Sequence, residues 1–523
     1  EPGDRVLLCY APGSAFFVAF WACLRAGVIA VPVYPPDPSK MAPALEKLRL
    51  VQAACGASLC LADSRVSLLR ATTALAYNWP KGLSWRNTEA LRSAPPLGDE
   101  AALDAAAGSD VAFLQFTSGS TGDPKGVIID HSNLWHNINC IIIPTNRRGA
   151  DLRGLPPEQR LTCVSWLPQY HDMGLIYSHV SPFVCGDAVV YMSPLTFIAQ
   201  PELWLIAASK YRATYLASPD FGYRLVAKRV LSRGRGYFVG DRALDLSCIH
   251  GIETAAERVR TVTYEALFEA LRPYGFDAMV VPAYGLAEHV VAASICARLD
   301  LVCVGTELLA VIKIVDVETC SEVALGATGE IWISSPSAAR GYWGQPELSR
   351  STFRAKLARD DGREYLRTGD EGFLERGGRL FVCGRLKDMI IVCGKNYYAE
   401  DAEVAAQEAL PDALRPGCIA AFSVDDGNEE ALVVVAEMRR AAEATAADVA
   451  KHARSAVGRA LGLAPKRVVL VREKTIPKTT SGATPRSSSG NPSHVKTRAV
   501  GGIAEARCRR GGRRTRNGLG IVG

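Results

Sequence analysis

The stretch Phe116-Thr-Ser-Gly-Ser-Thr-Gly-Asp-Pro-Lys-Gly126 follows the apolar run Val111–Leu114 and combines four hydroxyl side chains, two interior glycines and one lysine. Glycines allow backbone N–H groups to converge on an anion, while the hydroxyls and Lys125 add hydrogen bonds and a positive charge. A short Gly/Ser stretch is also consistent with a flexible surface loop. Because Pro124 fixes the chain just before Lys125, we favour a loop that wraps a polyphosphate.

The loop does not have the Walker pattern, which requires Gly-Lys followed directly by Ser or Thr. Here Lys125 is preceded by Pro124 and followed by Gly126. The sequence therefore indicates another class of nucleotide chemistry.

Length and composition predict two or more compact domains. The chain has 523 residues, 48% of them hydrophobic, which is sufficient for a large core. Its 15 cysteines include no Cys-x-x-Cys pair, a pattern typical of reduced thiols in a cytoplasmic protein rather than of a disulfide framework or zinc site. We expect no membrane span and no signal peptide, because no run of about 18 uncharged apolar residues occurs. The absence of an initial Met predicts that the true start lies upstream.

The net charge of +6 is concentrated in the last segment of the chain. Residues 483–523 hold nine Lys/Arg and one acidic residue, which leaves 51 Lys/Arg against 53 Asp/Glu in residues 1–482. The body is therefore slightly acidic, and the basic segment lacks interleaved aromatic residues. Nucleic-acid binding is not expected.

Apolar stretches alternate with helix-like segments over most of the chain, as in β-α units around a mostly parallel sheet. The expected strands include Arg5–Leu8, Val28–Val31, Ser58–Leu61, Val111–Leu114, Asp187–Met192, Ala213–Ala217 and Ala278–Val281, and the expected helices include Ala15–Ala26 and Lys47–Ala54. The proline-rich stretch Pro32–Pro38 is predicted to be a crossing loop rather than a helix or central strand. From Ala310 to Ile333 the predicted strands come closer together, as in a small barrel-like subdomain.

The predicted fold class is α/β with two domains and a tail. A large N-terminal domain, residues 1–385, contains the β-α subdomains and the β-barrel-like subdomain. A small α+β domain follows over residues 386–482, within the usual size range. Residues 483–523 read as a basic, disordered tail without amphipathic period.

Five further segments carry polar residues of the kind that bind nucleotides. They are Trp166-Leu-Pro-Gln-Tyr-His-Asp-Met-Gly174, Pro282-Ala-Tyr-Gly-Leu-Ala-Glu288, Tyr365-Leu-Arg-Thr-Gly-Asp370, Gly384-Arg-Leu-Lys-Asp388 and Lys474-Thr-Ile-Pro-Lys-Thr-Thr-Ser-Gly482. Each has an ordinary structural explanation when taken singly: His171 as a structural histidine, Glu288 as a helix cap, Asp370 as a turn former and Lys387 as a solvated charge. Their combined order and spacing make coincidence remote.

Together these segments resemble the adenylate-forming superfamily of acyl-CoA synthetases, luciferases and peptide-synthetase adenylation domains, over residues 1–482. Within it the chain looks most like the fatty acyl-AMP ligases, through the motifs Val164-Ser-Trp-Leu-Pro168, His171-Asp-Met-Gly174, Tyr284-Gly-Leu-Ala-Glu288 and Tyr365-Leu-Arg-Thr-Gly-Asp370. The stretch Phe353–Glu364 resembles an insertion associated with that subfamily, which is thought to restrict the domain rotation needed for transfer to CoA.

The resemblance assigns roles to individual positions. It implies catalytic roles for Lys125, His171 beside the acyl channel, Glu288 and the hinge residue Lys387. Mg²⁺ would be held by Thr121 and Glu288. It implies ATP contacts for Thr117, Ser118, Gly119, Ser120, Thr121 and Gly122, for Gly251, Glu253, Tyr284 and Gly285 around the adenine, and for Asp370 and Arg385 at the ribose.

This residue set suits carboxylate adenylation, in which a fatty acid carboxylate attacks the α-phosphorus of ATP and pyrophosphate leaves. The attacking group is already an anion, so the main obstacle is repulsion between anions, which cations and fixed dipoles offset. Mg²⁺ prefers oxygen ligands, which favours Glu288 over any cysteine site.

The sequence departs from the family after Gly482. The family carries a lysine there that reaches the carboxylate and α-phosphate, whereas this chain has Ala483. Lys478 matches a different family residue and is not assumed to substitute. The departure predicts ATP binding with slow acyl-AMP formation.

The expected activity is ATP-dependent activation of a medium- or long-chain fatty acid, for an acyl carrier protein or a polyketide or peptide synthase. Two alternatives stay open: a fatty acyl-CoA ligase, and a catalytically impaired module that binds nucleotide or acyl-adenylate.

Overall fold

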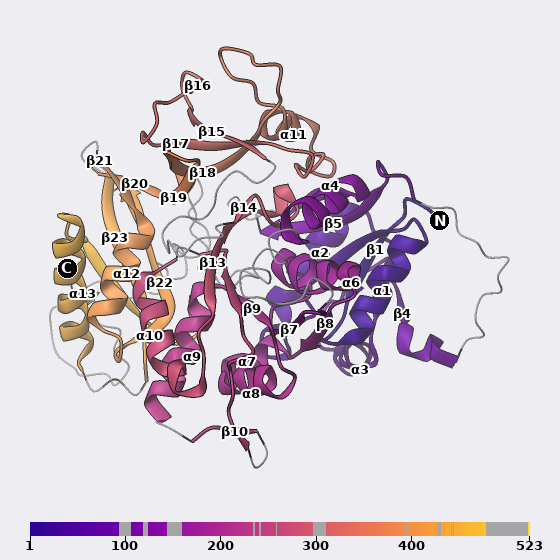
Figure 1. Ribbon diagram of the computed structural model, residues 1–523, viewed down its shortest axis with the longest axis horizontal. Helices are drawn as coiled ribbons and strands as arrows, with labels where there is room; N and C mark the ends of the chain where they lie inside the picture. Colours follow the sequence, from indigo (N-terminus) through magenta and orange to yellow (C-terminus); the bar gives the residue numbers. More distant parts are fainter. Residues whose placement is uncertain are drawn as a thin grey trace. The chain divides into compact units, whose positions relative to one another are not determined.

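The computed structural model describes residues 1–93, 106–118, 124–143, 159–233, 236–239, 242–257, 259–295, 310–392, 395–425, 430–440, 442, 444–476 and 521–522. It divides into two compact units (Figure 1). Unit 1 comprises residues 1–117, 124–368 and 372–382, and unit 2 comprises residues 118–123, 369–371 and 383–523. The main division, after Val382, lies three residues before the domain boundary that the sequence predicts.

The first sheet of unit 1 has the strand order β4-β3-β1-β2-β5-β6. Its strands are β1 (Arg5–Cys9), β2 (Ile29–Val33), β3 (Leu59–Ala62), β4 (Ser84–Asn87), β5 (Val111–Ser118) and β6 (Pro124–Asp130). The pairs β1–β2, β1–β3, β3–β4 and β2–β5 are parallel. The helices of this region are α1 (Ser14–Arg25), α2 (Met41–Cys55), α3 (Ser64–Thr73) and α4 (His131–His136), with 3-10 helices η1 (Pro38–Lys40) and η2 (Thr88–Ser93).

One detail of this sheet corrects the sequence prediction. Pro32 lies inside β2, a central strand, and is paired with Leu8 of β1. The pairing of β2 with β5 is at Ala30, two residues before the proline. Pro32 therefore lies near the end of the strand, where a missing N–H is tolerated.

The second sheet of unit 1 has the order β14-β13-β12-β9-β7-β8. Its strands are β7 (Thr162–Ser165), β8 (Ala188–Tyr191), β9 (Tyr215–Ser218), β12 (Gly251–Thr254), β13 (Met279–Tyr284) and β14 (Ser294–Ile295), and all pairs except β13–β14 are parallel. The connecting helices are η3 (Asn137–Ile142), η4 (Met173–Val180), α6 (Ser181–Cys185), α7 (Pro194–Ala199), α8 (Glu202–Lys210), α9 (Asp220–Arg233), α10 (Thr261–Leu271), η5 (Arg272–Tyr274) and η6 (Ala287–His289), and a hairpin is formed by β10 (Phe238–Val239) and β11 (Arg242–Ala243).

The two sheets share one hydrophobic core. Phe113 and Ile129 of the first sheet belong to the same buried cluster as Val164, Leu216 and Ile252 of the second. Strands buried on both faces and joined by helices are what continuous apolar runs predict. The α/β class is confirmed.

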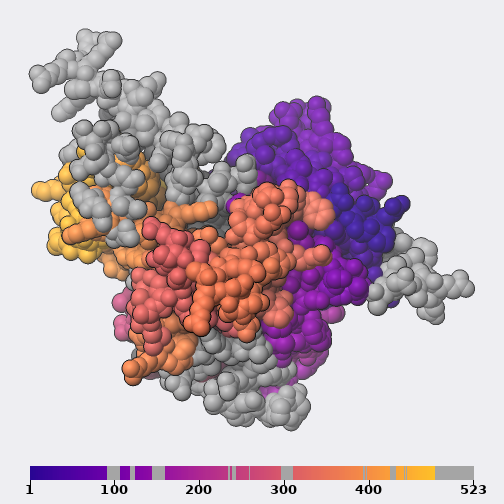
Figure 2. Space-filling view, turned by 90° about the horizontal axis from the view of Figure 1, so that it is seen from above, coloured from indigo at the N-terminus to yellow at the C-terminus, as the bar shows by residue number. Residues whose placement is uncertain are grey.

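A third, five-stranded sheet has the order β16-β15-β17-β18-β19. Its elements are β15 (Val311–Asp316), β16 (Ser321–Glu322), β17 (Gly329–Ser334), α11 (Pro346–Phe353), β18 (Leu366–Glu375) and β19 (Arg379–Arg385). This is the region in which the sequence predicts closely spaced strands. Figure 2 shows its coral to orange atoms at the surface.

In its described residues, unit 2 contains a short hairpin, the helices α12 (Ala399–Ala409) and α13 (Ala446–Leu461), and a four-stranded sheet. The hairpin β20 (Met389–Val392) and β21 (Lys395–Tyr398) follows η7 (Leu386–Asp388), and the sheet has the order β22 (Leu414–Asp425), β23 (Glu430–Met438), β24 (Arg467–Arg472) and β25 (Ile521–Val522). Helices α12 and α13 contribute to its core. The pairing of Ile521 and Val522 with β24 contradicts the expectation of a wholly disordered tail, and the rest of residues 483–523 lies outside the described residues.

Candidate functional site

The strand on each side of the predicted phosphate loop is well defined. Thr117 and Ser118 end β5, and Lys125 is the second residue of β6. The loop residues Gly119, Ser120, Thr121 and Gly122 lie outside the described part of the chain. The structure thus places Lys125 on a strand of unit 1, where its side chain is partly buried.

Asp130 ends β6 and fixes the helix that follows. Its Oδ1 accepts a hydrogen bond from the Asn133 backbone N–H at 2.7 Å, and Asn133 Oδ1 accepts one from the Asp130 N–H at 3.2 Å. This reciprocal capping satisfies backbone donors at the start of α4. Asn133 Nδ2 also donates to the carbonyls of Pro336 and Ala338, at 2.8 and 3.0 Å. The segment before Tyr342 is thereby attached to the base of α4.

Tyr342 brings Lys125 and Glu288 together. The Lys125 ammonium lies 5.3 Å from the centre of the Tyr342 ring, and the Tyr342 hydroxyl donates a hydrogen bond of 2.8 Å to Glu288 Oε1. A lysine over a tyrosine ring and a tyrosine hydroxyl on a carboxylate are both favourable contacts. Two residues 163 positions apart in the sequence therefore share one neighbour.

The turn that carries Glu288 is held by buried hydrogen bonds. Asn137 Nδ2 donates to the carbonyls of His289 and Ala292, at 3.0 and 2.7 Å, and its Oδ1 accepts from the Ala292 N–H at 3.3 Å. Ala339 N–H donates to the Glu288 carbonyl at 2.9 Å. Within this turn Val290 has φ +67°, which is unfavourable for a β-branched residue. The strain is sustained by the surrounding bonds, as is common at functional sites.

The predicted adenine residues lie on two neighbouring parallel strands, with Gly251 at the start of β12 and Glu253, Tyr284 and Gly285 at or beside the carboxyl ends of β12 and β13. Gly251 and Glu253 belong to β12, Tyr284 ends β13, and Gly285 follows it. Carboxyl ends of parallel strands are where ligands bind in open α/β sheets. Tyr284 is buried, and its carbonyl accepts a hydrogen bond of 2.9 Å from the Ala293 N–H.

The Glu253 side chain points into the protein interior. Its exposed fraction is 6%, and burial raises the pKa of its carboxyl to about 8, with only partial compensation from a hydrogen bond to Tyr177 of η4. The Tyr223 hydroxyl donates to the Glu253 carbonyl at 2.7 Å. Glu253 is therefore a protonated, buried acid at neutral pH.

We expect Glu253→Gln to become more stable relative to the unmodified chain as pH rises from about 4.5 to about 8. In this window the unfolded carboxyl loses its proton while the folded one keeps it, so folding of the unmodified chain costs more as pH increases. The relative gain in unfolding free energy should be on the order of 4 kcal/mol. Denaturant melts between pH 5 and pH 9 measure it. Glu46→Gln is the control, because the Arg49 hydrogen bond lowers the pKa of this exposed carboxyl, so its replacement should bring no gain in stability as pH rises. Parallel stability curves for Glu253→Gln and the unmodified chain would contradict the prediction.

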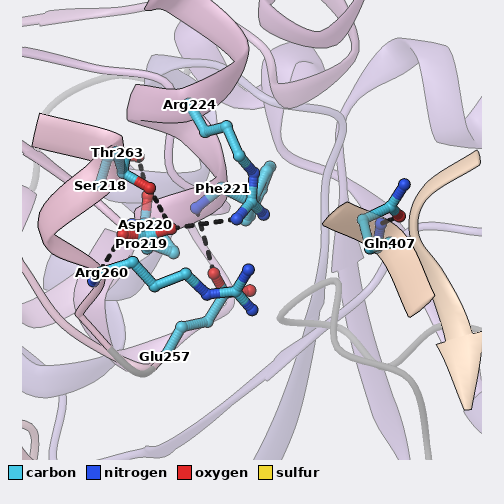
Figure 3. Close-up of polar contacts among 10 residues, drawn as sticks. Ser218, Pro219, Asp220, Phe221, Arg224, Glu257, Arg260, Thr263 and Gln407 are labelled. Atoms are coloured by element: carbon cyan, nitrogen blue, oxygen red, sulfur yellow. Dashed lines mark hydrogen bonds and ion pairs between the residues drawn. The ribbon is translucent and has the colours of Figure 1, made fainter. Parts of the chain in front are cut away.

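A buried carboxylate fixes the segment between β12 and α10 (Figure 3). Asp220 begins α9, and its oxygens accept hydrogen bonds from Thr263 Oγ1 at 3.0 Å and from the Arg260 N–H at 3.2 Å, while Arg224 forms an ion pair at 3.3 Å. Burial raises the pKa of Asp220, an effect opposed first by Arg224 and then by Thr263. The Phe221 N–H donates to Glu257 Oε2 at 3.1 Å. These bonds hold the turn that follows Gly251–Glu253.

His171 lies on the loop before η4 and contacts Asp172, with Nδ1 and Oδ1 2.6 Å apart. The same loop is tied to β5, because Gln115 Nε2 donates to the Tyr170 carbonyl at 2.9 Å. Burial acts to lower the pKa of His171, but attraction and hydrogen bonding to Asp172 outweigh it, so the pKa is raised. This ion pair stabilises the fold fully below the unfolded pKa of about 6.5 and loses its effect as pH rises through the higher folded value.

We expect Asp172→Asn to lower the pKa of His171, because the charge is removed while burial stays. A pH titration of the chain carrying ¹³C-labelled histidine, followed by NMR, measures the shift. His179, whose pKa burial lowers to about 3, provides an internal control that should remain neutral throughout. An unchanged His171 titration would show that Asp172 does not set its charge.

Unit 2 contains the remaining predicted site residues. Asp370 on β18 is buried, and its Oδ1 lies 3.2 Å from Nε of the exposed Arg385 at the end of β19. Lys387 is exposed on η7. The predicted ribose pair is thus in mutual contact. Ala483 lies outside the described residues.

The sequence prediction missed Tyr342, Asn137 and Gln115. Gly341-Tyr-Trp343 was available as a motif, but its aromatic residues look like ordinary core residues. Gln115 carries a detectable signal, since it is the one amide in the apolar run 111–116. Nothing in the local sequence distinguishes Asn137.

Residues 1–343 match the AMP-binding enzyme family. The chain belongs to this family. Among its relatives, a medium-chain-fatty-acid–[acyl-carrier-protein] ligase of Moorena producens (strain JHB), JamA, is 33% identical over 93% of this chain and 85% of the relative. A putative fatty-acid–CoA ligase of Mycobacterium tuberculosis, FadD21, is 33% identical over 93% of this chain and 87% of its own length. The solved structure of a fatty acyl-adenylate ligase from L. pneumophila, in complex with acyl adenylate and pyrophosphate, is 32% identical with a TM-score of 0.64, covering 91% of this chain and 84% of that chain.

The structure also bears on membrane and metal binding. Among the described residues, no helix combines the length and apolar character that crossing a bilayer requires. The same residues contain no cluster of three or more His, Cys, Asp or Glu side chains able to hold a metal. Glu288, whose Oε1 accepts the Tyr342 hydrogen bond, is a carboxylate of the kind that commonly holds Mg²⁺ together with substrate phosphates.

Proposed function

We propose that this chain converts a medium- or long-chain fatty acid and ATP into acyl-adenylate and pyrophosphate, and delivers the acyl group to an acyl carrier protein. The observation that carries the proposal is the joint placement of Lys125 and Glu288 around Tyr342, next to the strand that leads into the hydroxyl-rich loop. A positive charge and a carboxylate close together are what an Mg²⁺–polyphosphate requires.

In the proposed reaction a carboxylate oxygen of the fatty acid forms a bond to the α-phosphorus, and the bond between that phosphorus and the β-phosphate oxygen breaks. Pyrophosphate leaves with the bonding electrons. No proton has to be removed from the attacking group, so the task of the protein is to offset negative charge. Lys125 would contact the phosphates, and Mg²⁺ held by Glu288 and Thr121 would neutralise charge on the leaving group.

The preference for a carrier protein over CoA is supported by the named ligase of M. producens and by the stretch Phe353–Glu364. This stretch is anchored in unit 1: Ala355 and Tyr365 form a two-way backbone pair at 2.8 and 3.0 Å, and the Ala358 N–H donates to the Cys320 carbonyl at 2.8 Å. Ion pairs Arg354–Glu364 and Lys356–Asp360 link its own side chains. The stretch Phe353–Glu364 is thus attached to its neighbours by backbone hydrogen bonds, as a restraint on domain rotation would have to be.

The test supplies a panel of fatty acids and ATP to the purified chain and measures products by mass spectrometry, with and without CoA and with a phosphopantetheinylated carrier protein. We expect acyl-adenylate and an acyl-carrier thioester. Robust acyl-CoA would instead support the CoA ligase alternative, which the M. tuberculosis relative represents. Nucleotide binding without pyrophosphate release would support the binding module.

A further inference from the structure

The backbone of Tyr342 is bonded both to strand β6 and to the side chain of Ser349. It forms a bridge with Val127 of β6, with hydrogen bonds from Ile128 N–H to the Gly341 carbonyl at 2.9 Å and from Trp343 N–H to the Gly126 carbonyl at 2.7 Å. The Tyr342 N–H also donates to Ser349 Oγ at 2.8 Å. The backbone of Tyr342 is therefore attached to the strand that carries Lys125.

The ring of Tyr342 is also fixed by packing. Only 7% of the residue is exposed, and the ring makes an edge-to-face contact with Phe353, with centroids 5.1 Å apart. Such contacts restrict the ring in addition to the area they bury. The ring face and the hydroxyl are consequently presented at defined positions, one to Lys125 and the other to Glu288.

We propose that Tyr342 is a positioning residue that couples Lys125 to Glu288. Its hydroxyl donates to Oε1 of Glu288 and would hold this carboxylate in the orientation that binds the Mg²⁺ of a nucleotide, and its ring would keep the Lys125 ammonium near the phosphates. This inference rests on the proposed function, because it assumes that Glu288 and Lys125 serve a magnesium nucleotide. A hydrogen bond to a charged group contributes more than a neutral one, so loss of the hydroxyl should be measurable.

The experiment measures binding of α,β-methylene-ATP, which cannot release pyrophosphate, by calorimetry with EDTA and over a series of Mg²⁺ concentrations. Tyr342→Phe removes the hydroxyl and keeps the ring, so the Mg²⁺ concentration for half-maximal enhancement should rise about tenfold while affinity in EDTA stays unchanged. Tyr342→Leu removes the ring as well and should additionally weaken binding in EDTA roughly threefold. In the Glu288→Gln background, Tyr342→Phe should have no further effect on the Mg²⁺ dependence.

The matched control is Tyr365→Phe, because the Tyr365 hydroxyl donates to a different carboxylate, Asp361, at 2.7 Å. It should leave the Mg²⁺ dependence unchanged. A Tyr342→Phe chain within twofold of the unmodified chain, or equal losses with and without Glu288, would overturn the proposal. Because the assay contains no fatty acid, it separates this inference from the proposed function: a chain that binds the magnesium nucleotide but forms no acyl-adenylate refutes only the latter.

Discussion

Ala483→Lys is expected to release pyrophosphate about 100 to 1,000 times faster than the unmodified chain in the presence of fatty acid and ATP. Adenylation brings a carboxylate against the α-phosphate, and each anion is stabilised by cations that lie close to it. In the family that the chain resembles, a lysine at this position contacts both groups. Alanine offers neither a charge nor a hydrogen-bond donor. The transition state therefore loses a stabilising contact that the bound substrates do not need, and the rate falls.

The position of the added charge, and not charge alone, should decide the result. Thr484→Lys places the same cation one residue later and should accelerate the reaction far less. Pyrophosphate release in a coupled assay, with the fatty acid at saturation, measures both variants. An unchanged rate in Ala483→Lys would indicate that another cation, such as Lys478, already supplies the contact, and it would remove the reason for expecting slow turnover.

Much of the α/β core could be predicted because its strands are short, apolar and separated by helix-length segments. The exception at Pro32 is instructive: proline is excluded from central strands where its N–H is needed, and the end of β2 is not such a place. Pattern alone does not reveal where a strand stops pairing. The pairing of Ile521 and Val522 with β24 could not be predicted from the sequence either, because a strand of two residues shows no periodic pattern.

The site was only partly predictable for a different reason. Lys125 and Glu288 belong to motifs rich in polar residues that a hydrophobic core does not need, so they can be recognised as candidate site residues from the sequence alone. Tyr342 and Asn137 act through contacts with residues more than 50 positions away, and such contacts exist only after folding. Glu253 is the opposite case: its motif predicts a place beside the adenine, but in the fold its carboxyl is buried beside Tyr177.

Gly285→Ala is expected to destabilise the chain by more than about 3 kcal/mol and to disrupt the Glu288 turn. A Cβ on Gly285 would lie 1.6 Å from the Val291 carbonyl oxygen, 2.7 Å from its carbon and 3.0 Å from Ala292 Cα. These are backbone atoms, which cannot rotate away as a flexible side chain can. They belong to the turn that Asn137 fixes and in which Val290 is already strained. Relief of the clash must therefore displace the turn that carries Glu288.

Gly251→Ala is the matched control, since a Cβ there would meet only the Met279 carbonyl oxygen at 3.9 Å, an ordinary contact. Gly251 begins β12 and Gly285 follows the neighbouring strand β13, and both belong to the predicted adenine segments. Urea unfolding should show a change within about 1 kcal/mol for Gly251→Ala and a much larger loss for Gly285→Ala. Equal stability of the two variants would mean that the 285–292 turn can shift without cost, and the tight hold on Glu288 inferred from Asn137 and Ala339 would then have to be abandoned.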